Sequence, residues 1–249
     1  MSALVKSELL KIRTTRGWWA YLIVIVLLVG LGTAAEIGSA EETRRSELDF
    51  QLSLVELAGI ASLLAIILGI TMTTTEFRHG TITPTLLATP RRELVIAAKA
   101  IAGLLLALLF AALAFTVVAA ISVTWLSLID VDVRLGDGEI LTLAAKTVLG
   151  IVLWALLGVA IGILVHGQVA ALVGTLVWIF LGETLLIGVF GLLDIDDAAR
   201  YLPFQALDAA DGVGGDDLLS YWPGVAVSFG WIALLGALGT FRTRRRDIS

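Results

Sequence analysis

The chain has 249 residues, of which 58% are hydrophobic and 16% charged, and its mean hydropathy is +0.97. A soluble domain carries about 25% charged residues, so this composition excludes an ordinary soluble enzyme and indicates a polytopic membrane protein. The sequence contains no cysteine, which excludes disulfides, a thiolate nucleophile and cysteine metal ligands.

Residues 1–17 are predicted to form an amphipathic helix in the cytoplasm. Leu4, Val5, Leu9 and Ile12 fall within one arc of a helical wheel, while lysine and arginine occupy much of the remainder. A helix with this pattern lies in the membrane interface. The alternative is a simple basic leader that sets the topology, and both descriptions can hold together.

Six apolar runs follow, each long enough for a hydrocarbon core about 30 Å thick. We expect spans at residues 18–35, 52–74, 94–129, 143–165, 169–193 and 222–241. The third span is longer than one bilayer requires, so it must tilt, bend or protrude. His166-Gly167-Gln168 is predicted to be the tight turn between the fourth and fifth spans. The expected organisation is therefore an all-α, six-span unit over residues 18–241, preceded by the amphipathic helix and followed by a basic tail at 242–249.

The distribution of basic residues predicts the orientation of these spans. Most of the lysines and arginines fall on the side that holds both ends of the chain: Lys6, Lys11, Arg13, Arg16, Arg78, Arg91, Arg92, Lys99, Arg242, Arg244, Arg245 and Arg246. The other side holds Arg44, Arg45, Arg134, Lys146 and Arg200, together with most of the acidic residues. By the positive-inside rule both termini are cytoplasmic, and we expect a multi-pass protein of the cell membrane.

A polar segment at residues 75–92 separates the second span from the third. Thr83-Pro84 places a capping hydroxyl before a proline at a first helical position, which favours a helix start. Pro90 ends this turn by restricting Thr89 and begins the third span. We predict a short helix across the cytoplasmic face, whereas the alternative is an ordinary loop with snorkelling arginines. The helix would expose these side chains: Phe77, Arg78, Leu86, Leu87 and Arg91.

Glu183 is the one ionisable residue that we expect to be well buried. Its neighbours are apolar, and a buried carboxylate costs several kcal/mol unless it is paired or protonated. Two interpretations stay open. Glu183 is either a substrate contact or proton-linked group, or a residue of a water-accessible re-entrant loop that is hydrogen-bonded to freed backbone groups.

The fourth span carries a row of small residues at helical spacing. Gly150, Trp154, Gly158 and Gly162 follow an i, i+4 pattern. Small residues in such a row allow two helices to approach closely, so the row predicts close packing without identifying the partner helix.

The sequence lacks motifs for nucleotide binding and catalysis. It contains neither a Gly-x-x-x-x-Gly-Lys-Ser/Thr phosphate loop nor a Gly-x-Ser-x-Gly nucleophile elbow. The two histidines, His79 and His166, lie in different loops outside any metal-ligand pattern. We therefore expect no enzyme activity, cofactor, metal or nucleic-acid partner for this chain.

Four features of the chain point to one known family: the basic leader, the six spans, the cytoplasmic ends and the sequence Glu76-Phe-Arg-His-Gly-Thr-Ile-Thr-Pro-Thr-Leu-Leu-Ala-Thr-Pro-Arg-Arg92. In these features the chain resembles permease subunits of the type-2 ATP-binding-cassette exporter family, especially actinobacterial members. The resemblance implies a coupling helix that docks on a separate ATPase subunit, where ATP and Mg bind. Two permeases, expected to be a homodimer, would assemble with two ATPases. The implied docking residues are Glu76, Phe77, Arg78, His79, Gly80, Thr83, Pro84, Leu86, Leu87, Pro90 and Arg91.

The same resemblance implies a broken, re-entrant stretch near the fifth span, on the outer side. The candidates for it are Gly182, Glu183, Gly188 and Gly191.

We thus expect a permease that couples ATP hydrolysis on another subunit to export. Two other functions stay open: a non-transporting sensor or immunity subunit that uses the polar segment for regulation, and a self-contained secondary carrier. Against the carrier, Glu183 is the only ionisable side chain expected to be well buried, and the two three-span halves show no internal repeat.

Overall fold

The computed structural model describes residues 1–14, 17–78, 80, 92–212, 215 and 217–245, and the regular elements in these ranges are all helical. The α-helices are α1 (Ser2–Thr14), α2 (Trp18–Ser39), α3 (Leu48–Glu56), α4 (Ile60–Arg78), α6 (Arg92–Leu128), α7 (Gly138–Leu164), α8 (Gln168–Val177), α9 (Glu183–Leu192), α10 (Pro203–Ala210) and α11 (Tyr221–Arg245). Short helical turns are η1 (Arg44–Ser46), η2 (Leu57–Gly59), the π turn η3 (Trp178–Gly182) and η4 (Asp196–Tyr201).

The prediction of six spans in an all-α fold is confirmed for the described part of the chain. Six helical runs there are long and apolar enough to cross a membrane: Trp18–Ser39, Leu48–Arg78, Glu93–Leu128, Gly138–Leu164, Gln168–Leu192 and Tyr221–Arg242. The unusual length predicted for the third span is also confirmed, since α6 is a single helix of 37 residues.

The second run is longer than predicted, because its polar end stays helical. The hydroxyls of Thr73, Thr74 and Thr75 donate to the carbonyls of the preceding turn, at 3.0, 2.8 and 2.6 Å. Back-bonding of this kind satisfies a hydroxyl within the helix itself. The start of the predicted polar segment therefore belongs to the last turn of α4 rather than to a loop.

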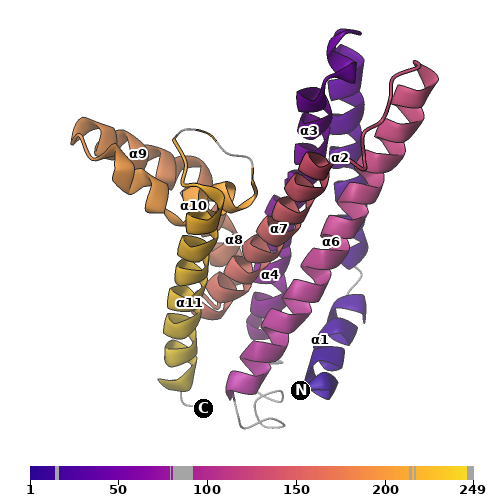
Figure 1. Ribbon diagram of the computed structural model, residues 1–249. Coiled ribbons are helices and arrows are strands. Elements are labelled where there is room, and N and C mark those ends of the chain that lie inside the picture. Colours follow the sequence, from indigo (N-terminus) through magenta and orange to yellow (C-terminus); the bar gives the residue numbers. More distant parts are fainter. Residues whose placement is uncertain (15–16, 79, 81–91, 213–214, 216, 246–249) are drawn as a thin grey trace.

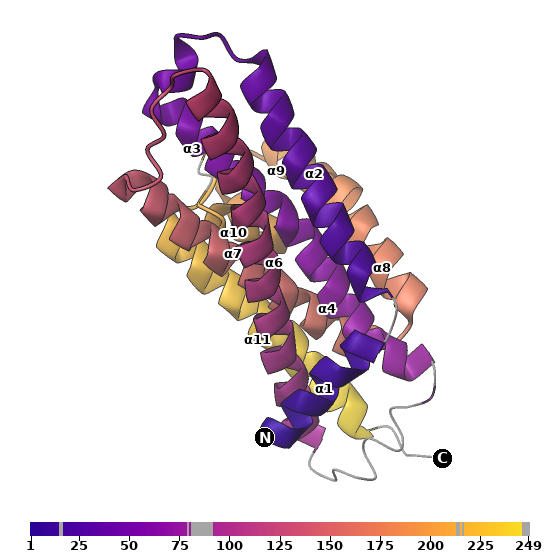
Figure 2. The ribbon, with the colours of Figure 1, turned by 90° about the vertical axis from the view of Figure 1, so that its right-hand side faces the viewer.

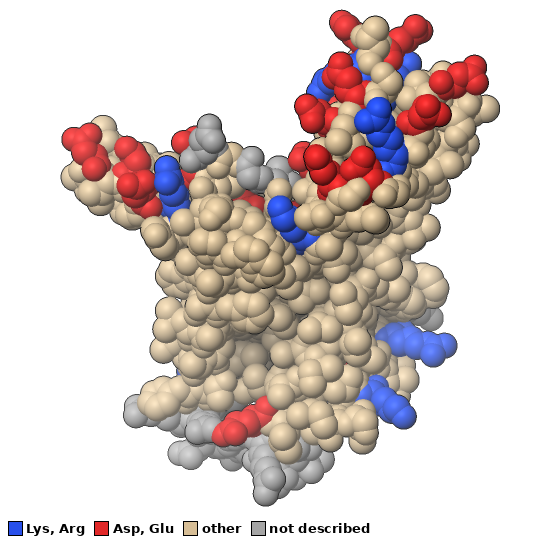
Figure 3. Space-filling view, in the orientation of Figure 1, with Lys and Arg blue, Asp and Glu red and all other residues tan. Residues whose placement is uncertain are grey.

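Helix α7 occupies the centre of the bundle. It contacts α4, α6, α10 and α11, while α2 packs against α6 on the outer side of this group. Figures 1 and 2 show α8 and α9 leading away from this centre and α1 lying beside the lower part of α6. On the face seen in Figure 3, acidic side chains gather at the upper end, and the middle is almost free of charge.

Two glycines of the predicted row, Gly158 and Gly162, form a packing seam between α7 and α4 within one chain. A Cβ at Gly158 would collide with the carbonyl oxygen of Ile66, and a Cβ at Gly162 would lie 2.9 Å from Cβ of Thr73. On the opposing helix, a Cβ at Gly69 would collide with the carbonyl oxygen of Ala155. These glycines let the two helix backbones touch, so the row serves the monomer's own core.

We expect Gly158→Ala to lower the free energy of unfolding by about 1–3 kcal/mol, because the added methyl group overpacks the seam. Gly174→Ala, on α8, is the matched control, since a Cβ at this position would have no atom within 4 Å beyond its own stretch of helix. It should be neutral or slightly stabilising, as alanine favours a helix over glycine. Unfolding of both variants in a denaturing-detergent titration measures the difference; equal effects would contradict the assignment of the seam.

The fifth span does not break where we expected a re-entrant stretch. The chain stays helical from Gln168 to Leu192, and the π turn η3 absorbs the irregularity, with the Trp178 ring stacked where a Cβ of Gly182 would lie. The short segment that returns to the bundle is instead α10, which contacts α7 and α11. Re-entry of this stretch of the fifth span into a membrane stays a prediction.

Candidate functional site

Four of the predicted docking residues lie in the described part of the chain: Glu76, Phe77, Arg78 and Gly80. Gly80 has a φ of 67° and donates its N–H to the carbonyl of Phe77 at 3.5 Å, which ends α4 with a left-handed residue. Glycine is favoured there because it has no Cβ. The other predicted residues lie outside the described ranges: His79, Thr83, Pro84, Leu86, Leu87, Pro90 and Arg91.

Phe77 and Arg78 attach the end of α4 to the turn between α7 and α8. The Phe77 ring meets the His166 ring edge to face, with 4.3 Å between centroids. The Arg78 guanidinium is exposed and donates to Oε1 of Gln168 at 3.2 Å. The turn predicted at His166 therefore lies next to the polar segment. Phe77 is partly exposed, and its role in docking stays a prediction.

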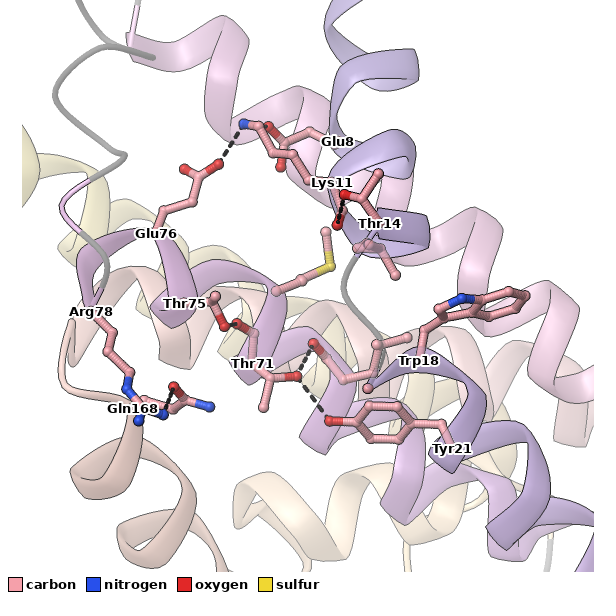
Figure 4. A pocket seen from close by; sticks show the side chains of 14 residues that line it. Glu8, Lys11, Thr14, Trp18, Tyr21, Thr71, Thr75, Glu76, Arg78 and Gln168 are labelled. Atoms are coloured by element: carbon pink, nitrogen blue, oxygen red, sulfur yellow. Dashed lines mark hydrogen bonds and ion pairs between the residues drawn. The ribbon is translucent and has the colours of Figure 1, made fainter.

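Glu76 points inward, contrary to its predicted place on a docking surface. It is only 4% exposed and lies in a cluster of four charged side chains, Glu8, Lys11, Glu76 and Lys99, here called the charge cluster. The physical reason is that a helical Glu76 faces α1 and α6, each of which supplies a lysine to it. Figure 4 shows Lys11 reaching toward both glutamates.

The charge cluster is an alternating ring of ion pairs. Nζ of Lys11 lies 2.6 Å from Oε1 of Glu8 and 2.5 Å from Oε1 of Glu76. Nζ of Lys99 lies 2.7 Å from Oε2 of Glu8 and 3.0 Å from Oε2 of Glu76. Each carboxylate thus uses one oxygen for each lysine, and the ring is electrically neutral.

Burial makes this ring sensitive to the loss of any member. Glu8 is 5% exposed and Lys99 2% exposed, so the prediction that Glu183 alone would be well buried was wrong. Burial by itself would lower the pKa of Lys11, but hydrogen bonds to Glu76 and Glu8 raise that pKa above its ordinary value. The charge of Lys11 is therefore kept by its partners.

Sequence reasoning missed Glu8 and Lys99 as members of a site. Both carried a signal: Lys99 interrupts the apolar stretch 94–129, and Glu8 lies next to the apolar arc of the N-terminal helix. A charged residue in such a position needs a partner. The sequence alone does not say which of several distant charges it is.

A cavity of about 510 Å³ adjoins the charge cluster. Tyr21 and Thr71, joined by a 3.1 Å hydrogen bond between their hydroxyls, form part of its wall. The cavity is bordered by α1, α2, α4 and the first residue of α8, and its lining is Glu8, Lys11, Ile12, Thr14, Gly17, Trp18, Tyr21, Leu68, Thr71, Met72, Thr75, Glu76, Arg78 and Gln168. Apolar walls with a few polar groups are typical of ligand-binding cavities.

Glu183 lies far along the chain from this cluster and binds the start of α10. Its Oε1 accepts from the backbone N–H of Phe204 at 2.9 Å, and its Oε2 accepts from that of Gln205 at 3.2 Å. The side chain of Trp178 donates to Oε1 at 3.4 Å. Leu202, at the N-cap position, has no side-chain oxygen, so Glu183 supplies the missing cap from α9.

Asp211 fixes the other end of α10. It is 9% exposed, and its Oδ2 accepts from Nε1 of Trp154 at 3.2 Å and from Oγ of Ser62 at 3.5 Å. Its backbone carbonyl accepts from Thr147 at 3.2 Å. Gly150 leaves room for the carboxylate, because a Cβ there would collide with Oδ1. The sequence had indicated only that most acidic residues lie on the side opposite the two chain ends.

The protein should become less stable as pH rises, through Asp211. Burial, followed by the nearby charge of Asp208, raises the pKa of Asp211 well above its ordinary 3.8, against smaller opposite effects of its hydrogen bonds. The folded state therefore binds this proton more tightly than the unfolded state. Stability is fully present below about pH 3.8 and falls from there as pH rises toward the folded-state pKa. Asp211→Asn should flatten this dependence in a thermal-unfolding series; an unchanged slope would contradict it.

The fold and the site together define a membrane-embedded helical subunit with a charged anchor at one end. A comparison with family profiles assigns residues 4–190 to the family described as "ABC-2 family transporter protein". The match covers well over half of the chain, so the protein belongs to this family of transporter membrane subunits. The sequence-based resemblance is thereby confirmed at the level of the family. A comparison with curated proteins found no significant match.

Proposed function

We propose that this chain is the permease subunit of an ATP-driven exporter in the cell membrane. The observation that carries the proposal is the charge cluster. Glu76 begins the segment 76–91 that we predict to dock on the ATPase, and its ion pairs join it to Lys11 of α1 and Lys99 of α6. A force on that segment would therefore be transmitted to α4, α1 and α6 together.

The other site residues would have two different roles in this mechanism. Arg78, exposed at the end of α4, and the predicted docking residues among 79–91 would meet the partner, while Phe77 would transmit its position to His166 and thus to α7 and α8. Because α7 packs closely on α4, a displacement of one helix would move the other. Alternating access follows if this motion reshapes a pathway between two permease copies.

ATP and Mg would bind to the separate ATPase subunits, since this sequence has no phosphate loop. The permease would supply the docking segment and the path for the cargo. A homodimer of permeases with two ATPases is the assembly that the family membership favours.

The buried charges of the cluster also bear on the carrier alternative. Glu183 is not the only buried ionisable residue, so its isolation no longer counts against a self-contained carrier. However, Glu183 is engaged by backbone donors of α10, and the four charges of the cluster are paired with one another. These buried carboxylates thus have structural partners, and membership of the transporter family supports the permease instead.

Affinity purification of the tagged protein from its native membrane tests the proposal. We expect an ATP-binding subunit to co-purify at about one copy per permease. Leu86→Asp, in the predicted docking segment, should abolish this recovery, while Leu10→Asp, on the exposed face of α1 (60% exposed), serves as the control for an added surface charge. A permease that purifies alone under mild detergent conditions would contradict the proposal.

A further inference from the structure

One wall of the cavity beside the charge cluster carries two carboxylates that bind a positive charge. Oε1 of Glu8 and Oε1 of Glu76 converge on one point, and the ammonium group of Lys11 occupies that point. Both glutamates and Lys11 line the cavity, so the point lies at its edge. Figure 4 shows this arrangement, with Trp18 and Tyr21 on another side of the same cavity.

The two lysines of the ring differ in how firmly they are held. The side chain of Lys99 is 3% exposed and lies behind the carboxylates, on their Oε2 atoms, whereas the side chain of Lys11 is 38% exposed. Lysine has a flexible four-carbon stem, so Nζ of Lys11 can swing away while its helix stays in place. The carboxylates would keep Lys99 and present their two Oε1 atoms to the cavity.

Lys11 does not leave this point without a substitute, because breaking a buried ion pair leaves an uncompensated charge. An ammonium group from a ligand would restore the neutral ring. The rest of that ligand would meet Leu68, Met72 and Trp18 in the cavity. Aromatic faces such as Trp18 and Tyr21 also attract cations.

We infer that this cavity is a binding site for an apolar organic cation, whose ammonium group takes the place of Lys11 between Glu8 and Glu76. In the absence of ligand, Nζ of Lys11 then occupies the position between the two carboxylates. The inference names a ligand class for the permease proposed above and rests on that proposal only for the role of the ligand as cargo. The binding itself is measured on the purified permease, without an ATPase.

The test uses dansylcadaverine, a fluorescent aromatic compound with a primary ammonium, and its neutral N-acetyl derivative. Lys11→Met removes the built-in ammonium and keeps an apolar stem. We expect the variant in lipid nanodiscs to bind dansylcadaverine at least about tenfold more tightly than the unmodified protein, because a vacated charge site no longer has an internal competitor. Affinity for the neutral derivative should be the same in both proteins.

Two controls separate the site from general charge effects. Lys6→Met removes one positive charge from the exposed face of the same helix and should leave the affinity unchanged. Adding Glu76→Gln to Lys11→Met should abolish most of the gain. A gain of the same size in Lys6→Met, or none in Lys11→Met, would overturn the inference.

A second measurement needs no variant and so does not depend on the folding of Lys11→Met. The N,N-dimethyl derivative of dansylcadaverine keeps the charge but does not react with acylating reagents. Saturating amounts should increase the acetylation of Lys11 in the unmodified protein, because its amine is released, and leave Lys6 unchanged. Unchanged or reduced acetylation of Lys11 would refute displacement. Either result leaves the ATPase partnership, tested by co-purification, unaffected.

Discussion

Lys99→Met should lower the free energy of unfolding by about 3–5 kcal/mol, the range observed when one partner of a buried ion pair is removed. Methionine has a similar volume, so the loss arises from charge rather than from packing. Two carboxylates, Glu8 and Glu76, would then share Lys11 alone in a region where neither is more than 5% exposed. The helix α1 would be the first element to detach, because the charge cluster is its polar anchor to α4 and α6.

A double-mutant cycle provides the decisive comparison. Combining Lys99→Met with Glu76→Gln restores neutrality and should recover a large part of the lost stability, whereas two independent sites would show additive losses. Lys6→Met, on the exposed side of α1, should change stability by no more than about 0.5 kcal/mol. Denaturing-detergent titration in mixed micelles gives these values. Strict additivity of Lys99→Met and Glu76→Gln would mean that the ring does not act as a unit.

The same ring explains why the sequence predicted the fold better than the site. Length and hydropathy specify six spans, because each span must satisfy its own backbone groups inside a membrane. Those local rules located α6 and the turn at His166 within a few residues. Ion pairs between Glu8, Glu76 and Lys99 join positions far apart in the chain, and no local rule fixes such pairings.

Glu76 shows how a local prediction fails for a physical reason. The sequence placed it in the polar segment 75–92, between the second and third spans. In the structure the three threonines that precede it bond to the helix carbonyls, so α4 continues and turns Glu76 toward α1. A polar residue at a membrane boundary is thus compatible with both a loop and a helix end, and its tertiary partners decide between them.

The glycine row of α7 shows the opposite case. Its spacing correctly predicted a close contact, because the absence of side chains has the same steric consequence in any helix pair. The partner could not be predicted, since a seam within one chain and a seam between two chains carry the same pattern. Collisions of a Cβ at Gly158 with Ile66 assign the seam to α4.

The second large effect is expected at Glu183. Glu183→Leu leaves the N–H groups of Phe204 and Gln205 without the carboxylate that accepts their hydrogen bonds. Each unsatisfied buried donor is worth about 1–3 kcal/mol, and a helix cap about 0.5–2 kcal/mol. We therefore expect Glu183→Leu to destabilise the protein by about 2–4 kcal/mol and to release the start of α10.

Glu183→Gln separates the two interpretations of this residue that the sequence left open. Glutamine keeps one carbonyl oxygen for a backbone N–H, so a cap should retain about half of its stabilising effect. A substrate contact or proton-linked group depends on the charge, and its loss would change substrate-stimulated turnover at normal stability. Thr184→Val, next along α9 and exposed, is the matched control. A larger loss of stability in Glu183→Leu than in Glu183→Gln, with turnover falling only in proportion to stability, would identify Glu183 as the residue that holds α10 against the bundle. Full stability of Glu183→Leu would exclude that role.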